Sequence, residues 1–354
     1  MDIYVLNSSY EKIGVIDNYQ SIIWTTRYFT PGDFELYIPA DRQLLSILQV
    51  DNMLVRDKDL SGDECRNVML IRNIEIQSDA ETGDNLIITG QCLKSIAARR
   101  VVAEQTNLSG SVENCLRALI TQNIISPSDT DRAINNFILG TDGSLTAATM
   151  SMQITGDNLA EALAEICATY GYGWDVFIKG TNLVFYIYEG ADRSFTQNTN
   201  PHVVFSTEYD NLLSSDYKED RSEYANVAIV AGEGEGTARK KATVGTASGL
   251  NRFEIWVDER NTSSNDGEIT PSAYQELLEQ AGAEKLAETG ITTEFTGEVL
   301  PNINFIYGVD YFLGDIVQIE NDYGISKPAR ITEIIDSEDE NGPTVIPTFE
   351  EGGI

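Results

Sequence analysis

Histidine is almost missing from this sequence: among 354 residues, His202 is the only one. A Ser-His-Asp or Cys-His catalytic unit would have to use it. His202 follows a proline and precedes a stretch with the pattern of a strand, which favours a surface or hydrogen-bonded structural role. The four cysteines form no C-x-x-C pair, so the usual zinc-site spacings are also absent. We therefore predict no catalytic residue, no metal site and no cofactor.

Basic residues are scarce. The chain has 24 lysines and arginines against 56 aspartates and glutamates, for a formal charge of −32. Nucleic acids and anionic membrane surfaces attract Lys and Arg, so binding of either class is not expected. The short basic runs at 99–100 and 239–241 are too small for a nucleic-acid site, and we expect them to pair with nearby acids. An acidic surface favours solubility, and it also suits a wall that lies near DNA without holding it.

Long apolar runs are missing too. The longest, such as 183–188, fall far short of the roughly 20 residues that a bilayer span requires. The N-terminal residues MDIYVL have the pattern of a strand, without a basic segment followed by a cleavable apolar core. We therefore expect neither a membrane span nor a signal peptide.

The abundant carboxylates show no catalytic or metal-binding spacing. The acidic runs 263–268 and 335–342 do not follow the calcium-loop pattern of an EF-hand. A pair of acids for glycoside hydrolysis would have no distinctive signature among so many. The glycine-rich run 232–236 is a poor phosphate loop, because Glu233 and Glu235 stand where an anion would approach.

The segment 24–40, WTTRYFTPGDFELYIPA, has the clearest local pattern in the chain. Pro31-Gly32 is strong turn chemistry, and apolar residues alternate with polar ones after it, so a strand, a turn and a second strand are expected. Pro39 should end the second strand, since it has no N–H to donate. Aromatic residues around this turn are candidates for an oligomer interface: Tyr28, Phe29, Phe34 and Tyr37.

The two ends of the chain read as β structure. Residues 1–100 contain short strands separated by turns, which is typical of a barrel or sandwich. Residues 225–354 have the same character after one helix. Both regions carry a Gly-Asp turn before an alternating apolar strand, at Gly32-Asp33 and Gly314-Asp315, which suggests a faint internal repeat.

Helical patterns lie between and after these ends. Ser111 is a good N-cap for one helix, a second runs from about Asp157 to Tyr170 with Gly171 as its C-terminal cap, and Thr270 caps a third. The predicted fold class is mainly β with an α+β insertion. It comprises a first tube-type β-barrel at 1–100, with 203–231 as a candidate to complete it, an inserted α/β module at 101–205, and a second tube-type β-barrel with one helix at 225–354.

Six strings in this order resemble a known family. They are WTTRYFTPGDFELYIPA (24–40), LKSIAARRVV (93–102), ITGDNLAEALAEICATYGYGWDVFI (154–178), YEGADRSF (188–195), FSTEYDNLLSSDY (205–217) and YFLGDIVQIE (311–320). Over roughly residues 3–349 the chain resembles siphophage minor tail proteins of the baseplate-hub type, which are similar to the N-terminal portion of tail-associated lysins.

The resemblance implies a structural virion protein at the tail tip, assembled in the host cytoplasm. It implies a homotrimer whose six barrels form a ring around a DNA channel and adapt the sixfold tail tube to a threefold tip. The implied partners are the distal tail protein or tail tube protein and a tip or fibre protein, with the tape measure protein as a further candidate. DNA is then only passing cargo, and no direct membrane binding is expected. The chain ends at EEGGI without the peptidase or glycosidase extension of tail lysins, so no enzyme is expected.

Two other functions stay open at this point. A surface adhesin or carbohydrate-binding protein could stack sugars on Trp24, Trp174 or Trp256, although tryptophan in strands usually packs in a core. A secreted glycoside hydrolase with two carboxylates would need an aromatic cleft and a signal peptide.

Overall fold

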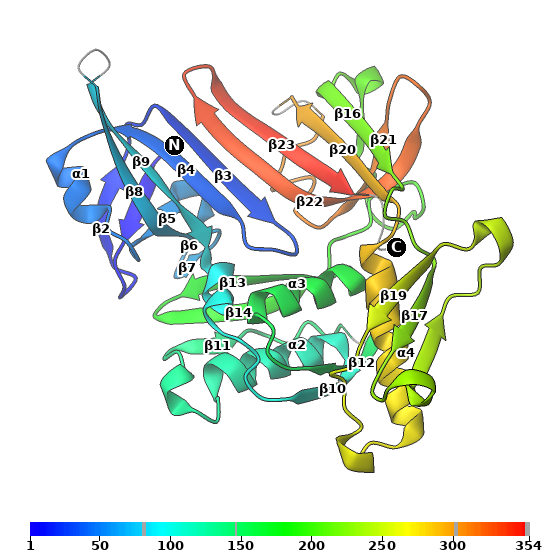
Figure 1. Cartoon of the computed structure of the whole chain (residues 1–354). Helices are drawn as coiled ribbons and strands as arrows, with labels where there is room; N and C mark the ends of the chain where they lie inside the picture. Colours follow the sequence, from blue (N-terminus) through cyan, green and yellow to red (C-terminus); the bar gives the residue numbers. More distant parts are fainter. Residues whose placement is uncertain (80–82, 146, 301–303, 351–354) are drawn as a thin grey trace.

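The computed structural model describes residues 1–79, 83–145, 147–300 and 304–350, and Figure 1 shows its layout. The fold is mainly β with few helices, as predicted. Two groups of strands lie side by side in one 13-stranded sheet. An α/β layer lies below them in the view of Figure 1, and a smaller sheet with one long helix lies beside that layer.

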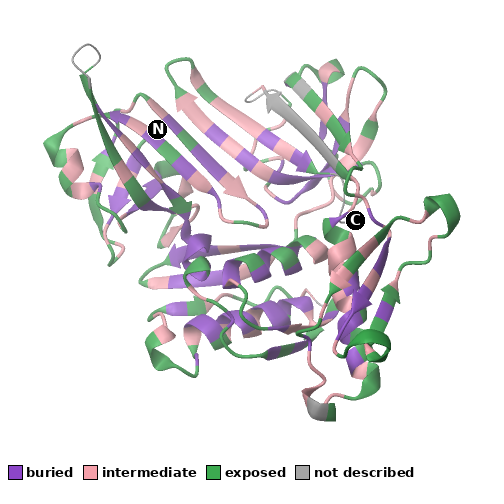
Figure 2. Cartoon of the chain, in the orientation of Figure 1, coloured by how far each residue is buried: buried purple, intermediate pink, exposed green. Residues whose placement is uncertain are grey.

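The first group of strands folds around its own apolar core. This core gathers Ile3, Ile16, Trp24, Leu36 and Ile88 from different strands. Along β3 and β4 these side chains alternate with more exposed ones, so one face of this part of the sheet is buried and the other is open (Figure 2). β5 is buried on both faces, because Met53 and Val55 pack in the core of the α/β layer. The group contains β1 (Ile3–Leu6), β2 (Lys12–Ile16), β3 (Ser21–Arg27), β4 (Asp33–Pro39), α1 (Arg42–Ile47), β5 (Met53–Arg56), β8 (Met69–Asp79) and β9 (Gly83–Cys92).

The predicted hairpin at 24–40 is confirmed. β3 and β4 pair in antiparallel register, and β4 ends at Pro39. A β-carbon on Gly32 would lie 2.1 Å from the carbonyl oxygen of Thr25, so only glycine fits at this position of the turn.

The second group folds around a separate core that includes Phe205, Tyr311, Val317, Ile331 and Phe349. Its strands come from two distant parts of the chain. They are β15 (Val204–Ser206), β16 (Leu212–Asp220), β20 (Thr292–Val299), β21 (Ile316–Glu320), β22 (Ser326–Asp339) and β23 (Gly342–Glu350).

The long strand β22 joins the two groups. Its first part pairs with β21 as far as Arg330, and from Glu333 to Glu338 it pairs with β3. A buried ion pair reinforces this junction, since Nη1 of Arg56 lies 2.8 Å from a carboxylate oxygen of Asp336. The result is a continuous antiparallel run of eight strands, in the order β16-β20-β23-β22-β3-β4-β9-β8. We call it the eight-strand run.

The α/β layer contains the largest apolar core, in which both of its helices are buried on one side. The N-caps predicted from the sequence are confirmed for Ser111, which accepts a hydrogen bond from the amide of Asn114, and Gly171 ends the second helix with φ +71°. The layer contains a five-stranded sheet, a strand pair and two helices: β6 (Leu60–Ser61), β7 (Glu64–Cys65), β10 (Thr106–Ser111), α2 (Val112–Ile120), β11 (Phe137–Leu139), β12 (Thr149–Ile154), α3 (Leu159–Tyr170), β13 (Gly173–Lys179) and β14 (Asn182–Tyr188).

Residues 225–290 form a further body, which we call the small sheet unit. The central strand β17 (Val227–Ala231) pairs with β18 (Lys241–Val244) and β19 (Glu254–Asp258), and α4 (Pro271–Glu288) packs on one face of the three. Thr270 caps α4 as predicted, and Pro271 is its first residue.

The strand pairing corrects two sequence expectations. Residues 203–231 do not complete the first group, because β15 and β16 pair with β21 and β20 in the second. Likewise, residues 225–290 are not the first part of the second barrel. They form the separate small sheet unit, which is inserted between β16 and β20 of the second group. Pairing between strands this far apart in the chain leaves no local pattern, so sequence periodicity could not assign these segments.

Candidate functional site

The connection between β3 and β4 is held by side chains from the α/β layer. Lys94, in a short 3₁₀ segment (Leu93–Arg99), is 3% exposed. Its ammonium group donates to the carbonyl oxygens of Arg27 at 2.6 Å and Tyr28 at 3.0 Å. The indole N–H of Trp174 on β13 donates to the next carbonyl, that of Phe29, at 2.6 Å. Three successive carbonyls of the connection are thus satisfied by one buried cation and one indole.

Tyr28 enters the α/β layer from this connection and is fully buried. Its hydroxyl lies 3.1 Å from the carbonyl oxygen of Gly171 and 3.3 Å from that of Tyr188, and it accepts a hydrogen bond from the amide of Gly190. Gly171 directly follows α3, and Tyr188 is the last residue of β14. Gly190 lies in the segment that leads to the second group. Tyr28 therefore fixes the position of the layer against the sheet.

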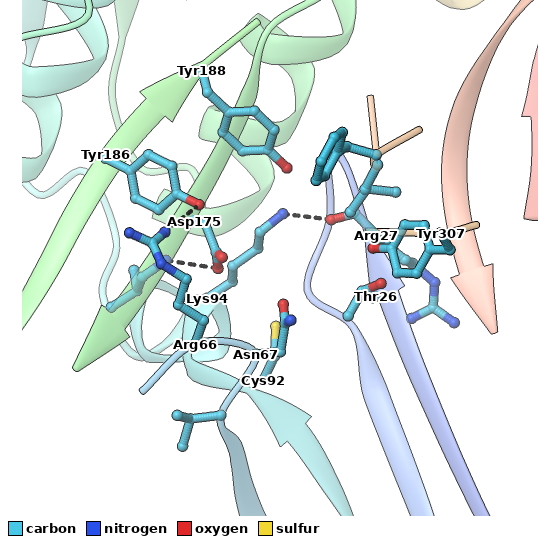
Figure 3. A pocket seen from close by; sticks show the side chains of 14 residues that line it. Thr26, Arg27, Arg66, Asn67, Cys92, Lys94, Asp175, Tyr186, Tyr188 and Tyr307 are labelled. Carbon is cyan, nitrogen blue, oxygen red and sulfur yellow. Dashed lines mark hydrogen bonds between the residues drawn. The ribbon is translucent and has the colours of Figure 1, made fainter. Parts of the chain in front are cut away.

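Next to this contact lies a cavity of about 180 Å³ between the first group, the second group and the α/β layer. Figure 3 shows Tyr186 and Tyr188 of β14 on one side and Tyr307 on the other, with Lys94 reaching towards Arg27 across the space between them. Asp175 of β13 also faces the cavity.

Burial changes the proton affinity of the groups around this cavity. It raises the pKa of the phenols of Tyr186 and Tyr188, and that of Tyr307 to about 12. Burial also raises the pKa of the Cys92 thiol and lowers that of Lys94. The phenols and the thiol are therefore protonated near neutral pH, and none is activated as a nucleophile. The cavity is a junction between three parts of the chain.

The four candidate interface residues have different environments. Tyr28 is fully buried and Phe34 is 2% exposed in the first core, so neither side chain is available to a partner in this conformation. Phe29 packs half-buried against the core of the α/β layer. Tyr37 is half-buried on the face of β4 that points away from the core, and it stays a candidate. The aromatic pattern of the turn thus reflects packing within the chain.

That open face of the eight-strand run is acidic among the described side chains. It carries Asp33 and Glu35 of β4, Glu75 of β8 and Glu333 of β22. The one arginine that β3 places there, Arg27, is bonded to Asp33 at 2.6 Å and Glu333 at 2.5 Å, so its charge is offset. Arg72 of β8 also lines this face beside Asp33 and Glu35, and it is bonded to Asp51 at 2.8 Å. Lys218 of β16 is ion-paired with Asp220 at 3.4 Å.

The remaining sequence candidates are His202 and the three tryptophans. The imidazole Nε2 of His202 lies 2.9 Å from the carbonyl oxygen of Gln197, which fits the hydrogen-bonded role predicted for it. Trp24 and Trp174 are fully buried and cannot stack on a sugar, whereas Trp256 is 52% exposed. Within the described ranges, no cluster of three or more His, Cys, Asp and Glu side chains is placed to hold a metal ion.

Comparison with known proteins assigns the chain to a family. A model of the Siphovirus ReqiPepy6 Gp37-like protein family matches residues 2–349. The chain belongs to this siphovirus tail protein family. The resemblance noted in the sequence is therefore confirmed. No curated protein sequence matches the chain.

Solved structures of phage tail proteins share its fold. A tail protein from Neisseria meningitidis MC58 is 14% identical with a TM-score of 0.60, and the match covers 99% of this chain and 97% of that one. The 43 kDa tail protein of prophage MuSo2 from Shewanella oneidensis is 13% identical with the same TM-score, covering 99% and 98%. Prophage tail protein gp18 from Listeria monocytogenes EGD-e is 13% identical with a TM-score of 0.53, covering 100% and 95%.

Sequence reasoning missed Lys94 and the glycines around Tyr28. A single lysine beside Leu93, Ile96 and Ala97 was the available signal for Lys94, because a cation in an apolar stretch is buried only when it has partners.

No helix in the described part of the chain has the length and apolar character needed to cross a bilayer.

Proposed function

We propose that this chain is a structural protein of the phage tail tip: a homotrimeric baseplate hub that adapts the sixfold tail tube to a threefold tip. In this proposal the two strand groups are the two tube-type barrels of each subunit. The domains are then a first barrel formed mainly by residues 1–100, an α/β layer, and a second barrel split by the small sheet unit. Membership of a tail protein family and the shared fold of three tail proteins support this assignment.

The observation that carries the proposal is the pair of open edges on the eight-strand run. Among the described strands, β16 pairs with β20 alone, and β5 covers only Met69 and Leu70 of β8. Residues 72–79 of β8 therefore have β9 on one side and, within the described chain, no strand on the other. Unpaired strand edges of this length offer a row of backbone donors and acceptors to another chain.

The strand directions fit ring closure. All neighbours in the run are antiparallel, so β16 and β8 at its two ends point in opposite directions. A copy rotated about an axis along the strands keeps these directions. Its β16 would therefore meet β8 of the first copy antiparallel, and the pattern would continue around the ring. The other free strand, β2, would meet β16 in parallel and break the alternation.

The open face of the run suits a DNA channel. In a closed ring, the apolar cores of both groups would lie on the outer side of the sheet. The open face would then form the inner wall of the channel. Its exposed acids, such as Glu35 and Glu75, would repel phosphate, so DNA would pass without adsorbing.

The proposed role is assembly and passage, not catalysis. One end of the ring would contact the distal tail protein or tail tube protein, and the other a tip or fibre protein, with the tape measure protein as a further partner. The chain would act at the tail tip of the virion after assembly in the host cytoplasm.

Mass in solution and particle symmetry test the proposal together. Light scattering of the purified chain should give three times the chain mass of 39.1 kDa, and electron microscopy should show threefold particles with a central hole and a sixfold-like wall. A monomer at micromolar concentration, or a particle without a hole, would count against it.

A further inference from the structure

The small sheet unit contacts the α/β layer across a cleft of about 330 Å³. The cleft lies between α4 on one side and α3 with β12 on the other. Glu165 of α3 and Glu284 and Glu288 of α4 all line it. An interface between two helices of one chain thus holds several carboxyl groups.

The charges around Glu284 are poorly balanced. Lys285 is the one lysine or arginine that lines the described cleft, and its ammonium group is bonded to Glu288. From α4, the side-chain amide of Gln280 donates to Glu284 at 3.0 Å and to the hydroxyl of Tyr170 on α3 at 2.6 Å. This neutral partner offers no charge to offset an ionised Glu284.

The other elements add more acid. α3 brings Glu165, with Asp157 just before it, and the end of β19 brings Asp258 and Glu259. Asp258 is paired with arginines and Glu259 accepts from the hydroxyl of Thr262. β12 contributes only neutral side chains.

Burial acts in the same direction as these charges. It raises the pKa of Glu284 to about 7, and the carboxylates of Glu165, Glu259 and Glu288 add to the rise. Burial also raises the pKa of Glu165, with Glu288 adding to it.

We propose that this cleft is a pH-dependent contact, in which the small sheet unit docks on the α/β layer with Glu284 protonated and separates as Glu284 ionises. The contact is a property of the single chain and does not rest on the proposed function. The unit is inserted between β16 and β20, so its separation acts on the strands at the open edge of the eight-strand run.

The sign follows from linkage. Because the docked pKa of Glu284 lies above its ordinary value of 4.5, docking takes up a proton between these values. The contact is therefore strongest below about pH 4.5, weakens as the pH rises, and is weakest above about pH 7. Each unit of pKa shift corresponds to about a tenfold change in the docking equilibrium. With partial exposure of Glu284, we expect a change of at least about tenfold across this range.

Two adjacent amides give a direct readout. The amide of Ser263 donates across the contact to the side-chain oxygen of Gln153 at 3.1 Å, whereas the amide of Ser264 donates to Glu233 at 3.0 Å within the small sheet unit. Separation of the contact exposes the first amide and leaves the second bonded.

The experiment measures hydrogen exchange of both amides by NMR in the wild-type chain and in Glu284→Gln, which mimics the protonated acid. Comparing the two proteins at the same pH cancels the intrinsic pH dependence of exchange. At about pH 8, Glu284→Gln should slow exchange at Ser263 by at least about tenfold. At about pH 4, below the ordinary pKa of Glu284, the two proteins should agree. Ser264 should be unchanged at both values.

Glu276→Gln is the matched control, because Glu276 is exposed on the same helix and its substitution removes the same charge. Glu165→Gln should act like Glu284→Gln with a smaller effect. The proposal is overturned if Ser263 exchanges equally in wild type and Glu284→Gln at about pH 8, or if Glu276→Gln slows it as much.

Discussion

A β-carbon on Gly314 would lie 2.2 Å from Cε2 of Tyr28, so these residues fit together only because position 314 has no side chain. A β-carbon on Gly173, which belongs to the α/β layer, would lie at the same distance from this ring atom. The Tyr28 ring, which comes from the first group, is therefore enclosed by a glycine of the layer and a glycine of the second group. Arg330 of β22 lies over its face at 5.5 Å. One aromatic ring thus connects three parts of the chain.

Gly314→Ala tests this packing. Gly314 has φ +94°, so alanine would add backbone strain to the clash with Tyr28. We expect a loss of about 2–4 kcal/mol in the free energy of unfolding, measured by urea denaturation. Gly342→Ala is the control, because Gly342 has φ +109° with nothing near a β-carbon. Gly342→Ala should lower the free energy of unfolding only by the cost of backbone strain, about 1 kcal/mol. If both variants lose the same free energy of unfolding, the contact with the Tyr28 ring adds nothing.

Tyr28→Phe isolates the hydroxyl. The substitution keeps the ring but leaves the amide of Gly190 and the carbonyl of Gly171 without this partner in a buried site. Unfolding free energy should fall by about 1–3 kcal/mol. Tyr323→Phe, at a side chain that is 92% exposed, should be neutral in the same denaturation assay. A neutral Tyr28→Phe would mean that water replaces the hydroxyl without cost.

Local patterns predicted the local structure well. The turn residues Pro31 and Gly32 gave the β3–β4 hairpin, and Ser111, Gly171 and Thr270 gave helix ends, because turns and caps depend on residues within a few positions. The basic residues Arg99 and Lys240 pair with acids as expected.

Long-range pairing was beyond the sequence pattern. Nothing local in β22 indicates that Glu333 lies opposite Arg27, since any amphipathic strand could pair there. The aromatic turn was misassigned in part for the same reason. Tyr28 and Phe34 are residue types that are common in interfaces. Tyr28 is buried by contacts with residues more than a hundred positions away, such as Gly171, and Phe34 is buried in the core of the first group.

The open edge of β8 gives a test of assembly. Ile76 lies on this edge and is 56% exposed. Ile76→Lys places a charge where the next copy would pair, so the dissociation constant of the oligomer should rise by at least about tenfold in sedimentation experiments. Ile13→Lys on β2, at a residue that is 40% exposed, should leave assembly unchanged. If both variants dissociate alike, the β8 edge is not the contact.

Reversing charge on the open face tests the channel wall. Glu35→Lys combined with Glu75→Lys turns two exposed acids of this face into bases. We expect the double variant to retain short duplex DNA at low salt, with retention lost as salt rises, whereas the wild type retains none. Glu208→Lys with Glu276→Lys makes the same charge change at exposed sites outside the eight-strand run. Equal retention by this control would show that the position of the acids is irrelevant.

The most direct test is a cryo-electron microscopy map of the assembled particle at a resolution that separates strands. The account predicts three copies around a central hole, with residues 72–79 of β8 in each copy paired antiparallel with β16 (Leu212–Asp220) of the next. A particle in which both edges face solvent, or in which copies join through other surfaces, would contradict it.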